Sequence, residues 1–167
     1  MVLRDDVATQ GPVLALKGES ATVTDIEGTV RRASSSDLDA VLECDRAAPV
    51  GREHGALLTA RVETGEVFLF ERAGAVRGYA VVRERAFFGR DFVELLSVAT
   101  GDRRSGVGSS LLQRTVESAS TPRIFTSTNE SNRPMVRLLE KAGWHLSGVL
   151  EGIDQGDPEL VYFMDAS

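Results

Sequence analysis

The chain has 167 residues, of which 42% are hydrophobic and 26% charged, as expected for one globular domain with a substantial core. Its formal net charge of −6 argues against a nucleic-acid surface, which needs a basic stripe, and suits a cationic small molecule or peptide amine as partner. No stretch approaches the roughly 18 apolar residues of a membrane-spanning helix, so we expect no membrane association.

Cysteine and histidine are scarce in this sequence. Cys44 is the only cysteine, and the two histidines, His54 and His145, lie far apart in the chain. This excludes an internal disulfide and gives no metal-binding spacing, so we expect a cytoplasmic protein without a metal. Cys44 lies beside apolar Val41 and Leu42, where a buried thiol is a more natural role than a nucleophile.

Residues 1–27 show no sustained hydrophobic period. We expect a partly disordered extension there, with at most a short strand near Val13–Lys17, followed by a single domain over residues 28–167. The domain is predicted to be α/β, with a mixed, mostly antiparallel sheet of about six or seven strands and about four helices. The predicted strands are Thr29–Ala33, Glu66–Glu71, Val76–Arg83, Phe92–Ala99, Arg123–Thr128, Leu146–Leu150 and Leu160–Met164, and the predicted helices span residues 34–45, 53–63, 106–118 and 133–142.

The helix boundaries carry recognisable signals. Ser34 and Asp37 have the spacing of a capping box at the start of the first helix. Asn132 can cap the last helix, with Pro134 tolerated in its first turn, and Gly143 can end it. The helix over 106–118 connects two strands that we expect to be parallel.

The most informative stretch runs from Phe92 to Gly108. An apolar strand leads into Arg103, Arg104 and a Gly106-Val107-Gly108 turn, and a helical pattern follows at once. The glycines allow the backbone to approach a bulky anion, and the free N–H groups of the first helical turn point at it. A Gly-x-Gly pair alone indicates only a turn and a helix start, but an arginine three residues earlier favours phosphate.

These residues resemble a known family. Arg103-x-x-Gly106-x-Gly108 resembles the acyl-coenzyme-A pyrophosphate signature of the GCN5-related N-acetyltransferases, the GNAT superfamily. Residues 132–144 resemble the second signature of that family, Asn-x-x-Ala-x-x-Leu-Tyr-x-Lys-x-Gly-Phe, with Leu139 in place of its tyrosine. The resemblance covers residues 28–164, and it implies the GNAT fold and acetyl-CoA as co-substrate.

The resemblance also implies where the coenzyme lies. Main-chain N–H groups would bind the pyrophosphate, and the pantetheine arm would lie like an extra strand against the strand before the turn, where the N–H of Val98 would stabilise the oxyanion. Asn132 would contact the same arm; the alternative is a plain helix N-cap, and one residue can fill both roles. The residues expected at the coenzyme are Leu96, Ser97, Val98, Arg103, Arg104, Ser105, Gly106, Val107, Gly108, Ser109, Asn132 and Leu139.

Glu94 is the best candidate for the catalytic base. With a period of two it would share a face with Phe92, Leu96 and Val98, so its carboxylate would lie among apolar neighbours. Many GNAT enzymes use a glutamate on this strand. The alternatives are a solvated or arginine-paired Glu94, with His54 as a second candidate base and His145 as a weaker one.

Leu139 cannot protonate the departing thiolate. A thiol with a pKa near ~8.5 can leave without an acid, so the enzyme hypothesis survives the substitution. Ser127, Thr128, Ser131 and Tyr162 are alternative sources of a hydroxyl, and the sequence does not choose among them.

The leading hypothesis is an acetyl-CoA-dependent transferase that acetylates a primary amine of a small molecule or peptide. The alternative is a non-catalytic acyl-CoA-binding or sensing module with the same fold. A generic nucleotide-binding domain would explain the glycine turn but not residues 132–144. The acidic loop Glu151–Glu159 either attracts a cationic acceptor or is a solvated turn, and the late strands suggest a homodimer.

Overall fold

The structure is a computed structural model that describes residues 27–45 and 52–166, so the expected extension and the strand near Val13–Lys17 lie outside the described residues. Seven strands form one sheet in the order β1-β2-β3-β4-β5-β7-β6. The strands are β1 Thr29–Arg32, β2 Val67–Arg72, β3 Ala75–Phe87, β4 Arg90–Val98, β5 Arg123–Asn129, β6 His145–Asp154 and β7 Asp157–Asp165, and the helices are α1 Leu38–Asp45, α2 Arg52–Glu63, α3 Val107–Glu117 and α4 Arg133–Lys141.

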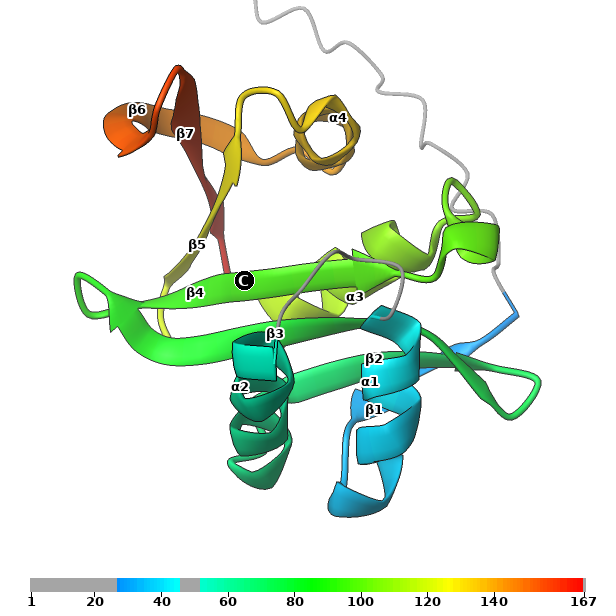
Figure 1. Cartoon of the computed structure of the whole chain (residues 1–167). Coiled ribbons are helices and arrows are strands. Elements are labelled where there is room, and N and C mark those ends of the chain that lie inside the picture. The colour runs from blue at the N-terminus through cyan, green and yellow to red at the C-terminus, as the bar shows by residue number, and fades with distance from the viewer. Residues whose placement is uncertain (1–26, 46–51, 167) are drawn as a thin grey trace, which may run out of the picture.

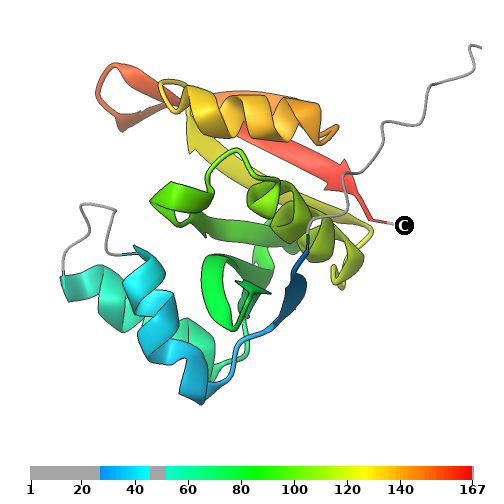
Figure 2. The same ribbon diagram turned by 90° about the vertical axis from the view of Figure 1, so that its right-hand side faces the viewer.

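The sheet is mixed, as predicted. Neighbouring strands are antiparallel except β4 and β5, which are parallel and joined through α3. Helices α1 and α2 lie on one side of the sheet, and α3 and α4 lie on the other (Figures 1 and 2). The predicted α/β class and the predicted order of elements are confirmed.

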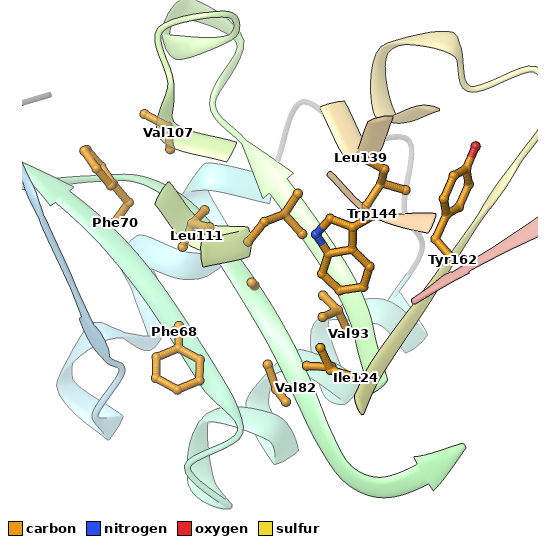
Figure 3. Close-up of a cluster of buried hydrophobic side chains, with 12 residues drawn as sticks. Phe68, Phe70, Val82, Val93, Val107, Leu111, Ile124, Leu139, Trp144 and Tyr162 are labelled. Atoms are coloured by element: carbon orange, nitrogen blue, oxygen red, sulfur yellow. The ribbon is translucent and has the colours of Figure 1, made fainter. Parts of the chain in front are cut away.

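Each side of the sheet has its own core. On the α3/α4 side, Leu111 and Leu139 pack with Phe68, Ile124 and other buried residues (Figure 3). On the α1/α2 side, a second cluster joins these two helices to alternate residues of β2 and β3. Burial on both faces explains why the inner strands read as apolar runs in the sequence.

Gly78 allows α3 to pack closely on β3. A Cβ atom there would lie 2.8 Å from the carbonyl oxygen of Ser97 and 2.9 Å from Cγ1 of Val107. Both distances are shorter than real side chains adopt, so a larger residue would push α3 away from the sheet. The closeness of α3 to β3 therefore depends on a glycine in the middle of a strand.

The prediction of an acidic loop over Glu151–Glu159 is wrong. Strands β6 and β7 extend through most of it and pair as far as Asp154 and Asp157, so the hairpin is longer than predicted. A turn at residues 155–156 closes the hairpin, and Gly156 supplies the left-handed φ of 77° that it requires. The acidic residues therefore lie at the tip of a hairpin.

The start of the first helix is fixed by Asp37. Its carboxylate accepts a hydrogen bond from the backbone N–H of Ser34 at 2.8 Å and two from the guanidinium of Arg31, also at 2.8 Å. These bonds, led by those from Arg31, hold the pKa of Asp37 well below its usual range. The capping box predicted from Ser34 and Asp37 is thereby present.

Asp37→Asn should lower the free energy of unfolding by about 1 kcal/mol near neutral pH, because it removes the charged cap. A carboxylate whose pKa is lowered on folding contributes fully above its unfolded pKa of about 4, and this contribution declines as the pH falls below that value. Thermal unfolding should therefore show a lower Tm, by roughly 2–4 °C at pH 7, and the difference should shrink towards pH 3. A difference that grows on acidification would contradict this role for Asp37.

Candidate functional site

Strands β4 and β5 form a fork. They pair only at Asp91–Ile124, Phe92–Phe125 and Val93–Thr126, and no further pair between them follows in the described chain. Beyond these pairs β5 turns away from β4 and continues beside β7 (Figure 1). The facing edges of the two strands therefore separate at Thr126, whose hydroxyl donates a 3.0 Å hydrogen bond to the carbonyl oxygen of Val93.

The amino end of α3 lies at the carboxyl end of β4 and is uncapped. Its first helical bond runs from the N–H of Ser110 to the carbonyl oxygen of Gly106 at 3.0 Å, and no side chain of the described residues caps the helix. The N–H groups of Val107, Gly108 and Ser109 therefore precede the helical ladder. Free N–H groups and the positive end of the helix dipole form a site for an anion.

The turn before α3 is held in an unusual backbone conformation. Arg104 has a φ of 62° and Gly106 a φ of 92°, both in the left-handed region. Arginine there costs of order 1 kcal/mol or more, so the surrounding contacts must fix the turn.

Asp102 anchors this turn, and the sequence analysis missed it. Its nearly buried carboxylate forms an ion pair with Arg72 and lies 3.6 Å from Nη1 of Arg77, both near the β2–β3 turn. The hydroxyl of Ser105 donates a hydrogen bond to the backbone carbonyl oxygen of Asp102 at 2.6 Å. The only sequence signal was an acidic residue just before two arginines, and its partners lie about 30 positions away in the chain.

The predicted coenzyme residues of β4 border the fork. Leu96 and Val98 pack against the core on the α3 side, whereas Ser97 pairs with Tyr79 of the other core. The side chain of Arg103 folds back so that its Nε lies 3.5 Å from the carbonyl oxygen of Val98. These residues lie where β4 leaves β5 and leads into the turn before α3.

Asn132 is the N-cap of α4. Its Oδ1 accepts from the N–H of Met135 at 3.4 Å, and its Nδ2 donates to the hydroxyl of Thr128 at 3.0 Å. The cap expected from the sequence is confirmed, and contact with a coenzyme stays a prediction. A Cβ atom on Gly108 would lie 2.9 Å from Cδ2 of Leu138, so Gly108 also lets α3 and α4 approach each other.

Glu94 lies in a β-bulge, which corrects the predicted strand face. Val82 of β3 pairs with Val93 and the preceding Val81 pairs with Leu95, so Glu94 is the extra residue. The bulge shifts the alternation after Glu94. Glu94 therefore shares the α2-side face with Phe92, as predicted, whereas Leu96 and Val98 pack on the opposite face.

The carboxylate of Glu94 is paired with two arginines. Oε2 accepts from Nε of Arg61 at 2.9 Å, and Oε1 accepts from Nη2 of Arg61 at 3.4 Å and Nη1 of Arg83 at 3.2 Å. Glu66 binds the same two arginines, at 3.4 Å and 3.1 Å. The expected apolar surroundings are therefore wrong, and the arginine-paired alternative describes Glu94. Its side chain remains 27% exposed.

Leu139 is completely buried. It packs in the α3/α4 core together with Trp144 and Tyr162 (Figure 3), so its side chain has no surface open to a ligand in this conformation. Burial raises the pKa of Tyr162 above its usual value, which disfavours the tyrosinate. A role for Leu139 beside a coenzyme sulfur stays a prediction that would require α4 to move.

The other candidate groups belong to other elements of the fold. His54 belongs to α2, and the exposed ring of His145 lies 5.4 Å from that of Phe163, at the start of β6. Cys44 is buried on the α1/α2 side, as predicted. Among the described residues no group of His, Cys, Asp and Glu side chains could hold a metal, and no described helix is long and apolar enough to cross a membrane.

The chain belongs to the acetyltransferase (GNAT) family, whose pattern matches residues 34–144. A GNAT-family acetyltransferase from Bacillus cereus is 28% identical over 84% of this chain and 98% of that one, with a TM-score of 0.80. The resemblance to GNAT proteins, inferred from the two signatures, is thereby confirmed. No curated protein matches the sequence.

Two more distant structures share the fold. YncA from Salmonella typhimurium, solved with its cofactor acetyl-CoA, is 22% identical over 84% of this chain and 95% of its own, with a TM-score of 0.65. The ribosomal-protein-S18-alanine N-acetyltransferase from Escherichia coli is 17% identical over 84% of this chain and 94% of its own, also with a TM-score of 0.65. At these identities the likeness concerns the fold alone.

Proposed function

We propose that this protein transfers an acetyl group from acetyl-CoA to a primary amine. The observation that carries the proposal is the uncapped amino end of α3 at the carboxyl end of β4, beside a fork whose strand edges lack partners in the described chain. The pyrophosphate would bind the N–H groups of Val107, Gly108 and Ser109, and the pantetheine arm would lie along β4. Family membership and a relative solved with acetyl-CoA support this ligand.

The chemistry needs three contributions from the chain. The N–H of Val98 would stabilise the oxyanion of the tetrahedral intermediate, and Glu94 would take the proton of the attacking ammonium. A carboxylate has roughly four acceptor sites, so the three contacts from arginine leave Oε2 of Glu94 a lone pair for that proton. The thiolate would leave without an acid, because Leu139 has no proton to give.

A non-catalytic acyl-CoA-binding module is the second candidate. The observation in its favour is Leu139, which stands where the family signature has tyrosine and is closed into the core. Such a module would keep the fork and the uncapped helix but transfer no acetyl group. Both candidate functions therefore predict binding of acetyl-CoA, and only the first predicts transfer of the acetyl group.

The experiment combines binding and transfer. Titration calorimetry with acetyl-CoA tests the site, and release of free thiol in the presence of a panel of primary amines tests transfer. We expect binding together with amine-dependent thiol release and an acetylated product detected by mass spectrometry. Binding without acetylation of any amine would favour the second candidate, and the absence of binding would contradict both.

Asp102→Asn tests whether the turn must be anchored. Removing the charge that pairs with Arg72 and Arg77 should leave the turn less ordered in the free protein. Part of the binding free energy of acetyl-CoA is then spent on ordering the turn. We expect the Kd for acetyl-CoA to rise about tenfold, which corresponds to about 1.4 kcal/mol. Asp39→Asn, at an exposed acid on α1, makes the same charge change and should leave the Kd unaltered. An equal effect of both variants would refute the anchor.

A further inference from the structure

Five of the seven phenylalanines in the chain touch one another in a row across the sheet. We call this set, Phe87, Phe88, Phe92, Phe125 and Phe163, the aromatic row. The ring of Phe87 lies 5.0 Å from that of Phe88, 5.3 Å from that of Phe92 and 5.1 Å from that of Phe125. Phe125 lies 6.0 Å from Phe163, so the contacts cross from β3 to β7.

The aromatic row belongs to neither core. The next residues along the same strands, Val93, Ile124 and Tyr162, point into the α3/α4 core, so the rings lie on the opposite face. The α1/α2 core does not include them either. Four of the rings are partly exposed and Phe88 is 93% exposed. A contiguous apolar patch that neither core covers is a candidate binding surface.

Phe88 cannot be explained by its turn. It has a φ of 47°, which is unfavourable for a bulky side chain and suits asparagine or glycine, and its exposed ring buries almost no surface. Beside it a cavity of about 450 Å³ opens, within the usual size range of small-ligand pockets. The cavity is lined by Phe87, Phe88, Arg90, Pro122, Arg123, Phe125 and Asp165.

The aromatic row reaches the proposed catalytic base. Phe92 and Phe125 form the pair just before Val93 and Thr126, the last pair before the fork. Phe92 of β4 also pairs with Arg83 of β3. Nη1 of Arg83 donates a hydrogen bond to Oε1 of Glu94 at 3.2 Å. Two residues along a strand span about 7 Å, so a short alkyl linker can join a ring on Phe92 to an amine at Glu94.

The charges on this surface are mostly neutralised. Nε of Arg123 lies 2.6 Å from Oδ1 of Asp165, and the guanidinium lies 4.1 Å from the centre of the Phe163 ring. The same ion pair lowers the pKa of Asp165. Arg90, which is exposed, also lines the cavity. The ring faces between these charged side chains are aromatic carbon, which suits a planar apolar group.

We propose that the aromatic row is the acceptor subsite and that the acceptor is a small primary amine bearing an aromatic ring on a short linker. The inference rests on the proposed acetyl transfer and adds the class of substrate. The ring would stack on Phe92 and Phe125, over the cavity beside Phe88, and the amine would reach Glu94 at the fork.

The test compares acceptors that differ only in the ring. Phenethylamine and tryptamine are measured against butylamine, with kcat/KM for acetyl transfer as the readout. Because stacking and burial of a ring favour the aromatic amines, we expect their kcat/KM to exceed that of butylamine about tenfold or more. Equal values for the three amines would overturn the proposal.

Two variants locate the preference. Phe125→Ala and the fully solvent-facing Phe88→Ala should each lower the ratio of aromatic to aliphatic kcat/KM towards one. Ile153→Ala removes an exposed apolar side chain of β6 and should keep the ratio. An unchanged ratio in both phenylalanine variants would overturn the proposal. The proposal would also be overturned if Phe88→Ala turned a dimer into a monomer and left the ratio of aromatic to aliphatic kcat/KM unchanged. In that case a second copy of the chain covers the aromatic row.

Binding separates this inference from the proposed function. Calorimetry measures the affinity of phenethylamine and butylamine for the protein saturated with coenzyme A. If neither amine is acetylated but phenethylamine binds at least about tenfold more tightly, acetyl transfer fails and the aromatic row stands as a ring-binding site. If the two bind equally, the aromatic row has no such role.

Discussion

Glu94→Gln is expected to lower kcat/KM for acetyl transfer by about 100-fold or more while leaving the affinity for acetyl-CoA unchanged. Glutamine keeps the shape of the side chain but cannot take a proton from the attacking ammonium. The proposed coenzyme site uses main-chain groups of β4 and α3, which the substitution does not alter. Steady-state kinetics and calorimetry on the same preparation measure the two quantities.

Glu66→Gln is the matched control. Glu66 binds the same two arginines as Glu94, so its substitution disturbs the same ion-pair cluster without removing the proposed base. We expect it to keep most of the wild-type kcat/KM. Equal losses in the two variants would show that Glu94 acts by holding Arg61 and Arg83 in place and takes no proton.

The pH dependence adds a second criterion. Near neutral pH the acceptor is an ammonium that must be deprotonated, whereas close to the pKa of the amine, near ~10, free amine is abundant. The deficit of Glu94→Gln should therefore be largest near pH 7 and should shrink at high pH. A deficit that stays constant with pH indicates a residue that only shapes the site.

Gly106→Val should abolish the thermal stabilisation of the protein by acetyl-CoA. A ligand that binds only the folded protein raises its Tm by mass action, so loss of binding removes the shift. Valine is unfavourable at the φ of 92° found at Gly106, and its side chain would obstruct the approach of the pyrophosphate to the N–H groups of α3.

Gly65→Val separates strain from obstruction. Gly65 has a φ of 72°, and a Cβ atom there would meet no atom within 4 Å, so valine adds backbone strain at a distance from the fork. We expect Gly65→Val to lower the Tm of the free protein and still to show the shift with acetyl-CoA. A Gly106→Val protein that binds acetyl-CoA normally would show that the anion site is elsewhere.

Local patterns in the sequence predicted the fold well. The capping box at Ser34, the N-cap Asn132 and the helix-ending Gly143 each depend on residues only a few positions apart, and the structure confirms all three. The hairpin of β6 and β7 was predicted too short, because acidic residues at its tip resemble a solvated loop when their cross-strand pairing is unknown.

The site was harder to predict because it depends on long-range contacts. One extra residue in β4 separates Glu94 from the face of Leu96 and Val98, and a bulge leaves no mark in a pattern of alternating residues. Arg61 and Asp102 were missed because their partners lie about 30 positions away. The aromatic row was missed for the same reason, since its members come from four strands.

A crystal structure of the protein with coenzyme A bound tests the central claim most directly. We predict that the pyrophosphate oxygens lie within hydrogen-bonding distance of the N–H groups of Val107, Gly108 and Ser109, and that the pantetheine arm lies between β4 and β5 along Leu96 to Val98. The sulfur should then lie near the bulge that holds Glu94. Coenzyme A bound elsewhere, with the amino end of α3 free and the fork empty, would contradict the account.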